Sequence, residues 1–479
     1  MKIMKTLYWH DYETWGANPA TDRASQFAGV RTDEDLNIIG EPLVMYCKPP
    51  EDLWPNPMAC LITGITPQQA QDKGIQERQF IELIFREFSQ PGTCGVGYNT
   101  IRFDDEVTRY TLFRNFYDPY EREWRNGNSR WDIIDMVRAV YALRPEGIEW
   151  PVLDDKPSFK LEYLTQANGI SHGAAHDAFS DVEATIGLAK LIKQKQPQLY
   201  DYVYQHRMKN KVSALIDLAA RKPLLHISSR FPATRGCAGL IAPLAIHPVN
   251  KNAIIVIDLS VDPSPLLHLT PEQIRQRVFV SNDDLPEGEE RLPIKLIHLN
   301  KCPVLATPKL ITAAHEQRLG LDKTLCEKHW QMIRHWDIAS KLQEMYRLDN
   351  FTPSADPEAQ LYNGFVNDRD KSLMAQVRNA TAEELAKHNY LFEDERLNRI
   401  LIRYKARNFY DALTQDEKSQ WQEFVRDRLF SSEGEHLHYT SFLTEVEQLQ
   451  ETHAGDADKQ NILQALRVYA EQCKAKYFI

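Results

Sequence analysis

The sequence lacks several features that would place it in a large class of proteins. Its seven cysteines are scattered and form no CxxC pair, so neither a zinc site nor a disulfide framework is predicted. No apolar run approaches the roughly 18–20 residues of a membrane span. The start, MKIMKTLYWHDYE, has no long apolar stretch and no small-residue cleavage site, which argues against export. These absences predict a protein of the reducing cytoplasm, without membrane segments.

Positive charge is also in short supply. The chain has 57 Lys and Arg against 67 Asp and Glu, a formal net charge of −10, which by itself argues against a nucleic-acid partner. The remaining composition, 43% hydrophobic and 26% charged over 479 residues, is ordinary for a globular protein. At roughly 100–200 residues per domain, this length predicts about three domains.

The pattern of apolar residues changes twice along the chain. In the first third, strand-like runs such as CGVGYN alternate with helix-like runs such as VEATIGLAKLIKQ, which is typical of an α/β domain. The β-branched runs at 252–260 and 292–300, with helical PEQIRQRVF between them, indicate a small β-rich domain. Apolar residues recur at helical spacing in the last third. Polar 193–201 and turn-rich 348–360 mark the boundaries, so the predicted domains are 1–197, 198–350 and 351–479.

The stretch LYWHDYETWG (7–16) places two acids in an apolar strand pattern. On a strand, residues i and i+2 share a face, so Asp11 and Glu13 project side by side, and Tyr12 points the other way into the core. One interpretation is a strand end whose acids reach water. The other is a divalent-metal site, because adjacent carboxylates suit magnesium or manganese.

Two later segments carry further candidates. In YNTIRFDDEVTRY (98–110), Asp104 follows an apolar strand and opens a helical pattern. It could be a helix N-cap, and Asp105 or Glu106 could be first-turn acids favoured by the helix dipole. In HDAFSDVEATIGLAKLIK (176–193), Asp181 stands five positions after His176, which on a helix would turn the two about 140° apart. His176 is therefore expected on the loop before the helix, where a lone histidine can also have no role, and Asp181 in the first turns.

In this order, DxE, NxxxFD and HxxxxD resemble the DEDD exonuclease superfamily, in its subgroup with a histidine in the last motif. The resemblance implies a ribonuclease H-like mixed sheet flanked by helices, with His176 as the general base. The NxxxFD spacing selects Asp104 over its acidic neighbours. The resemblance also implies two Mg²⁺ ions, for which Mn²⁺ can substitute, held by four carboxylates: Asp11, Glu13, Asp104 and Asp181.

A closer resemblance extends over nearly the whole chain. HDYETWG, LITGITPQ, YNTIRFDDEVTR, NSRWDIIDMVRA and AHDAFSDVEATI, and later APLAIHPVNKNA, LNKCPVLA, AQLYNGF and YKARNF, resemble the bacterial exonuclease I family. This implies an α/β exonuclease domain, a small SH3-like β-rich domain and an all-α C-terminal domain around a DNA path. The implied activity is processive 3′→5′ degradation of single-stranded DNA to nucleoside 5′-monophosphates by two metal ions, in DNA repair and recombination. The alternatives are a DEDD enzyme acting on short RNA and a catalytically silent scaffold that binds single strands.

A single-strand path has independent support in the segment 99–144. Every basic residue there is arginine, and aromatic residues are interleaved with them. Bases stack on aromatic faces for about 1–3 kcal/mol each, although about half of these aromatics are expected in the core. Local clustering of this kind overrules the argument from net charge. With Glu13, the resemblance selects five substrate contacts: Arg109, Tyr120, Trp124, Arg138 and Lys160, the last an arginine in most of the family.

The resemblance also implies a protein partner, the acidic C-terminal tail of single-stranded DNA-binding protein. The matching positions are Arg144, Tyr202, Lys222 and Arg334, while Thr312 stands where the family has a basic residue. In the last third, Arg396, Arg399 and Arg403 recur at i, i+3 and i+7, which indicates either a solvated stripe or a wall of the DNA path. A monomer is the default expectation.

Overall fold

The computed structural model describes residues 4–173, 176–281, 284–348, 353–432 and 436–477. The chain divides into two compact units. The first comprises residues 1–129, 172–183 and 353–479, and the second comprises 130–171 and 184–352. The first unit thus combines most of the predicted exonuclease domain with the C-terminal third.

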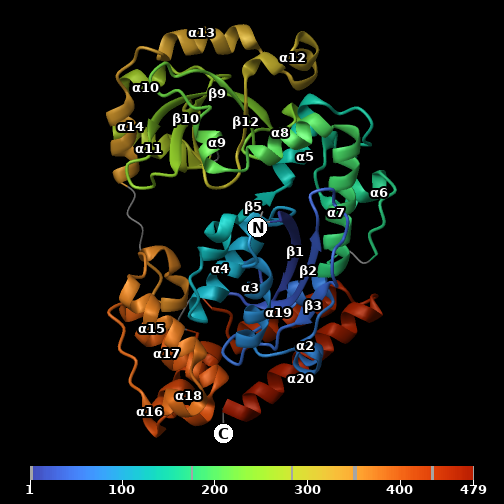
Figure 1. The fold of residues 1–479 in the computed structure, drawn as a ribbon, viewed down its shortest axis with the longest axis vertical. Coiled ribbons are helices and arrows are strands. Elements are labelled where there is room, and N and C mark those ends of the chain that lie inside the picture. Colours follow the sequence, from blue (N-terminus) through green and yellow to red (C-terminus); the bar gives the residue numbers. More distant parts are fainter. Residues whose placement is uncertain (1–3, 174–175, 282–283, 349–352, 433–435, 478–479) are drawn as a thin grey trace. The chain divides into compact units, whose positions relative to one another are not determined.

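A mixed sheet forms the centre of the first unit (Figure 1). Its strands β1 (Thr6–Thr14), β2 (Ala24–Thr32), β3 (Leu43–Tyr46) and β4 (Thr93–Gly97) lie in the order β3-β2-β1-β4. β2 runs antiparallel to both β1 and β3, and β4 runs parallel to β1, as the superfamily resemblance implies. The pairing with β4 ends at Trp9 and Val96, so the second half of β1, with both acids, extends beyond β4.

Helices α3 (Glu77–Phe88) and α4 (Asp104–Arg114) cover one face of this sheet. Tyr8, Tyr12 and Phe27 of the strands pack there with Phe80 and other apolar residues of the two helices. Tyr12 is 3% exposed, which confirms its predicted place in the core. Because successive strand residues alternate between faces, Asp11 and Glu13 lie on the opposite face.

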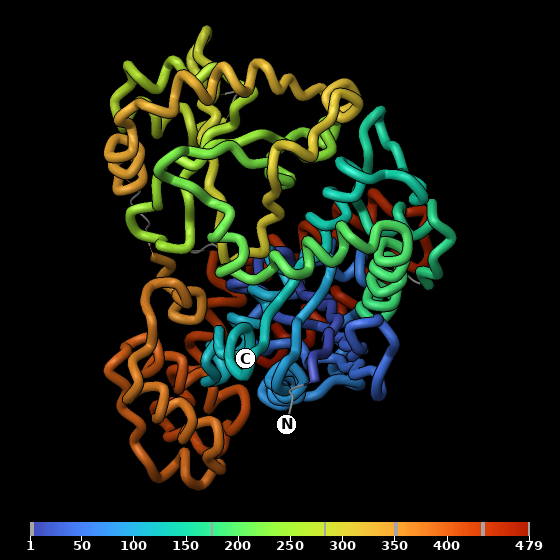
Figure 2. Tube along the Cα trace, turned by 45° about the horizontal axis from the view of Figure 1, so that its top comes forward, coloured from blue at the N-terminus to red at the C-terminus, as the bar shows by residue number. Residues whose placement is uncertain are grey.

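The C-terminal third is helical, as predicted, and can be followed from orange to red in Figure 2. Its core joins that of the N-terminal region: Trp54 stacks on Phe442 with ring centroids 4.9 Å apart, and Phe116 stacks on Phe392 at 5.6 Å. These contacts explain why the two ends of the chain form one unit. The helices concerned are α1 (Pro57–Thr63), α2 (Pro67–Lys73), α15 (Asp368–Asn379), α16 (Ala382–Lys387), α17 (Glu395–Asn408), α18 (Gln415–Phe430), α19 (Tyr439–Thr452) and α20 (Ala457–Tyr477).

Buried ion pairs reinforce this junction within the first unit. Arg407 on α17 binds Asp52 at 2.7 Å and Glu358 at 2.5 Å, and Arg403 binds Asp356 at 2.6 Å. Arg403 is only 9% exposed, so at this position both interpretations of the arginine stripe, a solvated face and a DNA-facing wall, are wrong. Its charge instead pairs with the buried carboxylate of Asp356.

Replacing Arg407 with alanine is expected to lower the free energy of unfolding by about 3–5 kcal/mol, because it leaves buried carboxylates without their cation. Urea denaturation measures the difference. The matched control is Arg369→Ala, whose ion pair with Glu393 is more than half exposed on both sides and contributes about 0–1 kcal/mol. Equal losses in the two variants would contradict a structural role for the buried pairs.

The second unit contains an antiparallel sheet in the order β11-β10-β9-β8-β12. The two predicted β-branched runs form its strands β10 and β11, and the predicted helix between them is α11 (Pro271–Phe279). The strands are β8 (Leu224–Ile227), β9 (Ala238–Ile246), β10 (Ala253–Asp258), β11 (Ile294–His298) and β12 (Val304–Ala306).

Helices make up most of the rest of the second unit. The predicted boundary at 193–201 is helical on both sides of Gln196, because α7 (Ala178–Lys195) ends there and α8 (Pro197–Gln205) begins. None of the helices in the described residues combines the length and apolar character needed to cross a membrane.

The elements not yet named are β5 (Ser129–Asp132), α5 (Ile134–Leu143), the hairpin β6 (Val152–Leu153) and β7 (Lys156–Pro157), α6 (Leu161–Ala167), α9 (Lys209–Ser213), α10 (Pro265–His268), α12 (Ala313–Leu319), α13 (Lys323–Ile333) and α14 (Ala339–Arg347).

Candidate metal centre

The first two acids of the candidate site lie near the end of β1. Asp11 is paired with Ala28 and Glu13 with Gln26 in the register with β2, and the register shifts directly after Glu13. Glu13 is 8% exposed. A buried carboxylate requires compensation by hydrogen bonds or a cation, so these positions are unfavourable unless other groups complete the site.

The third acid is placed by the tight turn that follows β4. A Cβ atom at Gly97 would lie 2.1 Å from the Thr100 side chain and 2.8 Å from the His10 carbonyl oxygen, so only glycine fits. Asn99 then adopts a left-handed conformation with φ 64°, which asparagine tolerates better than most residues. The turn brings the start of α4 against β1, where Asp104 Oδ1 accepts a hydrogen bond from the Tyr12 N–H at 3.0 Å.

The neighbouring acids have other partners. Asp105 forms a buried ion pair with Arg122 at 2.6 Å, and Glu106 binds Arg109 at 2.9 Å. α4 begins at Asp104, and its N-cap residue is Phe103, so the N-cap interpretation of Asp104 is wrong. Of the three consecutive acids, Asp104 is the one whose carboxylate bonds to the strand that carries the DxE pair.

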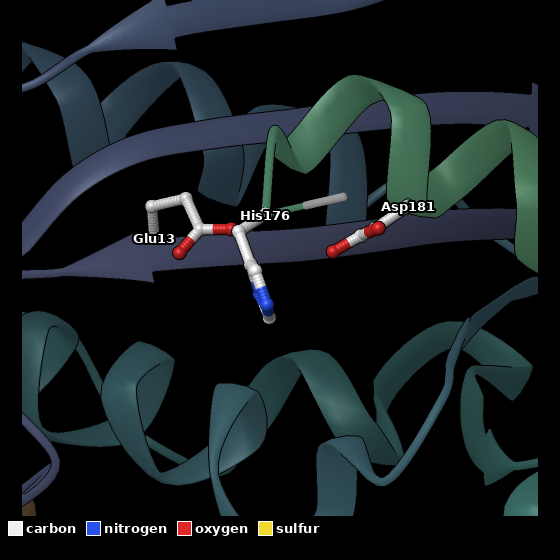
Figure 3. A group of neighbouring side chains, drawn as sticks. All are labelled: Glu13, His176 and Asp181. Carbon is white, nitrogen blue, oxygen red and sulfur yellow. The ribbon is translucent and has the colours of Figure 1, made fainter. Parts of the chain in front are cut away.

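The start of α7 supplies the last two candidates. Asp177 anchors this end to the sheet, since its carboxylate accepts hydrogen bonds from Gln26 of β2 and from the N–H of Ser180, both at 3.1 Å. His176 precedes the helix, and Asp181 lies in its first turn, where the spacing predicted them. Figure 3 shows these two side chains next to that of Glu13, and one ligand atom of each of the three lies within 4.8 Å of the others.

The carboxylates of the site repel one another. Burial raises the pKa of Glu13, and the charges of Asp181 and Asp104 raise it further, to about 9. Burial likewise raises the pKa of Asp11 well above its ordinary value, followed by the charges of Asp104, Glu13 and Asp181. Glu13, His176 and Asp181 thus meet in one place, and Asp11 and Asp104 lie close enough for their charges to act on one another. Together they offer carboxylate oxygens and one imidazole. This donor set fits hard divalent cations such as Mg²⁺ or Mn²⁺.

Binding of a divalent cation is expected to release protons near neutral pH. With a pKa of about 9, the Glu13 carboxyl is protonated below that pH without a cation, whereas a metal ligand must be deprotonated. The affinity should therefore rise with pH up to about 9. Titration calorimetry in buffers of different ionisation enthalpy counts the protons. Binding without proton release would contradict the coupling of these carboxylates.

A second histidine, His172, lies near the site. His172 Nε2 lies 2.5 Å from Asp181 Oδ1, although the two stand nine positions apart in the sequence. Burial raises the pKa of Asp181, and the hydrogen bond from His172 partly offsets this effect. Two histidines therefore lie beside the last carboxylate. His176 stands at the HxxxxD spacing from Asp181, whereas His172 stands at the same spacing from Asp177.

The predicted DNA contacts of the first unit surround Arg109. Its guanidinium binds Glu123 at 2.7 Å as well as Glu106, and it lies over the ring of Tyr120 at 5.3 Å. Trp124 is 66% exposed. Sequence reasoning missed Phe365, which is 89% exposed and contacts Tyr120 edge to face; it lies in AQLYNGF, a stretch noted only for its family resemblance.

The other two predicted DNA contacts, Arg138 and Lys160, lie in the second unit. Arg138 on α5 binds Asp135 at 2.6 Å and lies over the ring of Phe159. Lys160 follows Phe159 in the chain, and its side chain is 68% exposed. Arg138 therefore contacts the Phe159 ring, whereas the Lys160 ammonium lies over the Tyr163 ring at 5.5 Å.

The residues predicted for a protein partner all lie in the second unit. The Tyr202 hydroxyl donates to the Leu305 carbonyl at 2.8 Å, and Arg334 lies over the ring of Trp330. The carbonyl of Arg221, the residue before Lys222, accepts a hydrogen bond from Trp330. This contact brings Lys222 close to α13, which ends directly before Arg334. Arg144 and Thr312 are exposed.

Family models match three successive parts of the chain. A model described as "Exonuclease" matches residues 8–189, the region that holds all five candidate residues. Models described as "Exonuclease I SH3-like domain" and "Exonuclease I C-terminal domain" match residues 207–348 and 355–473. The fold and the clustered carboxylates define an exonuclease with two accessory domains.

Comparison with characterised proteins narrows this class. The chain is 46% identical to Exodeoxyribonuclease I of Haemophilus influenzae over 468 residues, covering 97% of this chain and 98% of that protein. It is also 46% identical to Exodeoxyribonuclease I of Escherichia coli over 474 residues, covering 98% of each. The chain belongs to the exonuclease I family of exodeoxyribonucleases.

Solved structures of relatives have the same fold. E. coli Exonuclease I in complex with a dA16 oligonucleotide is 46% identical, with a TM-score of 0.95 over 98% of this chain and 100% of that one. A zinc-bound form of an E. coli ExoI–ssDNA complex is 45% identical, with a TM-score of 0.94 over 98% and 99%. An ExoI/SSB-Ct complex is 44% identical, with a TM-score of 0.92 over 98% and 99%.

Proposed function

We propose that the protein is a processive exonuclease that degrades single-stranded DNA from the 3′ end and releases nucleoside 5′-monophosphates, in DNA repair and recombination. The observation that carries the proposal is the meeting of Glu13, His176 and Asp181 beside the charges of Asp11 and Asp104. The names of the relatives and their complexes with single-stranded DNA support the same substrate.

The four carboxylates would hold two divalent cations, Mg²⁺ by preference and Mn²⁺ as a substitute. Such ions, when bound, stabilise the attacking and the leaving oxygen of phosphodiester hydrolysis. His176 accepts the proton of the attacking water, since imidazoles titrate near neutrality. Its position on the loop before α7 lets it approach the water without disturbing Asp181 on the helix.

The exposed aromatic residues of the first unit would hold the bases. We assign this role to Trp124 and Tyr120, and add Phe365 because it is exposed and contacts Tyr120. Arg109 already neutralises two carboxylates and is 5% exposed, so its main effect on the strand is to orient Tyr120. In the second unit, Arg138 and Lys160 would bind the phosphates of the strand.

The second unit would also bind a protein partner. Arg144, Tyr202, Lys222 and Arg334 form the candidate site for the acidic C-terminal tail of single-stranded DNA-binding protein, and the ExoI/SSB-Ct complex of a relative supports this assignment. Thr312 cannot supply a cation there. Its hydroxyl instead caps α12 with His315 at 2.8 Å. Fewer charges than in the family predict weaker binding, whose electrostatic part falls as salt rises.

The proposal also covers the domain limits, the cellular compartment and the oligomeric state. We propose domains at 1–197, 198–350 and 351–479, and the ranges of the three family models support this division. All seven cysteines are free thiols, and six of them are buried, which supports a reducing cytoplasm. We propose a monomer as the active form.

End-labelled oligonucleotides test the proposed activity. With Mg²⁺, single-stranded DNA labelled at its 3′ end should lose the label at once as a mononucleotide, whereas a 5′ label should appear only in shortened strands. Chelation should stop both reactions, and an RNA strand of the same sequence should be degraded far more slowly. Shortening from the 5′ end, or faster degradation of RNA, would overturn the proposal.

A further inference from the structure

A second cavity lies in the first unit, apart from the candidate metal centre. Its volume is about 670 Å³, within the range of about 300–1,000 Å³ that is typical of small-ligand sites. It opens between the segments that precede β2 and follow β3, the end of α4, and the ends of α17 and α20. All its lining residues belong to the first unit, and none of them belongs to the five residues of the metal centre.

Cations outnumber anions on its walls. The two lining carboxylates already have partners: Glu77 binds Arg114 at 2.8 Å, and Glu51 binds Lys476 at 2.9 Å. Burial would raise the pKa of Glu77, but Arg114 and Arg23 outweigh that effect and hold it at about 2, so this carboxylate stays charged. The six basic lining residues are Arg23, Lys48, Arg114, Arg407, Arg426 and Lys476.

Several of these cations have unused hydrogen-bonding capacity. Arg23 and Arg114 are each 2% exposed, and Nη1 of each guanidinium has no hydrogen-bond partner among the described residues. A buried donor without an acceptor is destabilising. Neither Lys48 nor Arg426 forms an ion pair with a carboxylate in the described parts of the chain. The two Nη1 atoms are shielded from solvent, so the cations that an anion in the cavity would meet are Lys48 and Arg426.

Aromatic residues form another part of the lining. Tyr410 is 40% exposed, whereas Trp421 is buried and has Arg407 over its ring at 5.5 Å. The exposed Tyr410 ring is therefore the one that could stack with a nucleobase. Amide side chains that can bond to the edge of a base also line the cavity, namely Gln71, Gln76, Asn408 and Gln422.

We propose that this cavity binds a nucleoside 5′-monophosphate, with its phosphate among the cations and its base against the aromatic wall. That the ligand is a nucleotide rests on the proposed function, because the reaction releases this class of molecule. The anion site itself rests only on the cations and the volume described above. A nucleotide here would contact α17, α18 and the β3 end together, so product would bind and stabilise the junction between the N-terminal and C-terminal parts of the unit.

Titration calorimetry with dAMP in EDTA tests the proposal on the full chain, because no turnover occurs without a divalent cation. The double variant Lys48→Gln/Arg426→Gln should raise the dissociation constant at least tenfold, and neither side chain is buried, so the fold should persist, as circular dichroism can verify. Lys387→Gln, an exposed lysine outside the cavity, should bind dAMP like the wild type. Asp181→Ala should also bind it like the wild type.

Three results would overturn the proposal. The first is no binding of dAMP up to about 5 mM. The second is binding that the double variant leaves intact, which would place dAMP outside the cavity. The third is equally tight binding of inorganic phosphate or of deoxyadenosine, which would exclude a nucleotide site. A wild-type protein that binds dAMP in the cavity but degrades no DNA would retain this site and refute the proposed function.

Discussion

Replacing Asp181 with alanine is expected to reduce DNA degradation to less than about one-thousandth of the wild-type rate, while single-stranded DNA still binds. Asp181 is the α7 carboxylate that meets Glu13 and His176, and loss of a cation ligand removes several kcal/mol of charge stabilisation from the transition state. The aromatic and basic residues assigned to the strand are untouched. Release of labelled mononucleotide measures the rate, and fluorescence anisotropy measures the binding.

Glu183→Ala is the matched control for this variant. Glu183 is an exposed acid two residues further along the same helix, so its removal changes the net charge equally and should leave the rate near that of the wild type. If Asp181→Ala degrades DNA normally, the assignment of the fourth carboxylate is wrong. If both variants lose activity together, the effect comes from the charge or stability of α7.

Replacing His176 with alanine is expected to slow cleavage by about 10²–10⁴-fold, the usual contribution of a general base. Cation binding should persist, because the four carboxylates remain. His172→Ala should have a smaller effect, since His172 only holds Asp181 through a hydrogen bond. Single-turnover rates across a range of pH separate the two roles: loss of the base removes a titration step, and loss of a positioning residue leaves that step in place.

The reverse order of effects would assign the base to the other histidine. If His172→Ala loses the titration step and His176→Ala keeps it, then the HxxxxD motif identifies the wrong side chain. An unchanged rate in both variants would require another proton acceptor. Metal titrations of each variant are a necessary control, because a change in cation affinity alone would also lower the rate.

Much of the site could be predicted from the sequence, because its positions follow from local rules. Alternation along a strand places Asp11 and Glu13 on one face and Tyr12 in the core. The helical pattern after residue 177 places His176 outside α7 and Asp181 in its first turn. The fold class and the accessory domains were accessible through the extended family resemblance, whose motifs recur over nearly the whole chain.

Other features depend on contacts between distant segments, and no local rule predicts them. Arg403 and Arg407 match an amphipathic pattern, but their partners Asp356, Glu358 and Asp52 come from other parts of the chain. The resemblance could select Asp104 from its neighbours, but the physical reason, the pairing of Asp105 with Arg122, appears only in the fold. The contact of His172 with Asp181 likewise follows from the path of the loop before α7.

The proposed activity requires that four carboxylates from β1, α4 and α7 hold the cations that act on the 3′ end of single-stranded DNA. A crystal structure of the wild-type protein with Ca²⁺ and a short single strand tests this requirement most directly. We expect cations about 2.3–2.6 Å from oxygens of Asp11, Glu13, Asp104 and Asp181, beside the last phosphodiester of the 3′ end. Cations bound by Asp105 instead, or a 5′ end beside these carboxylates, would contradict the proposed centre.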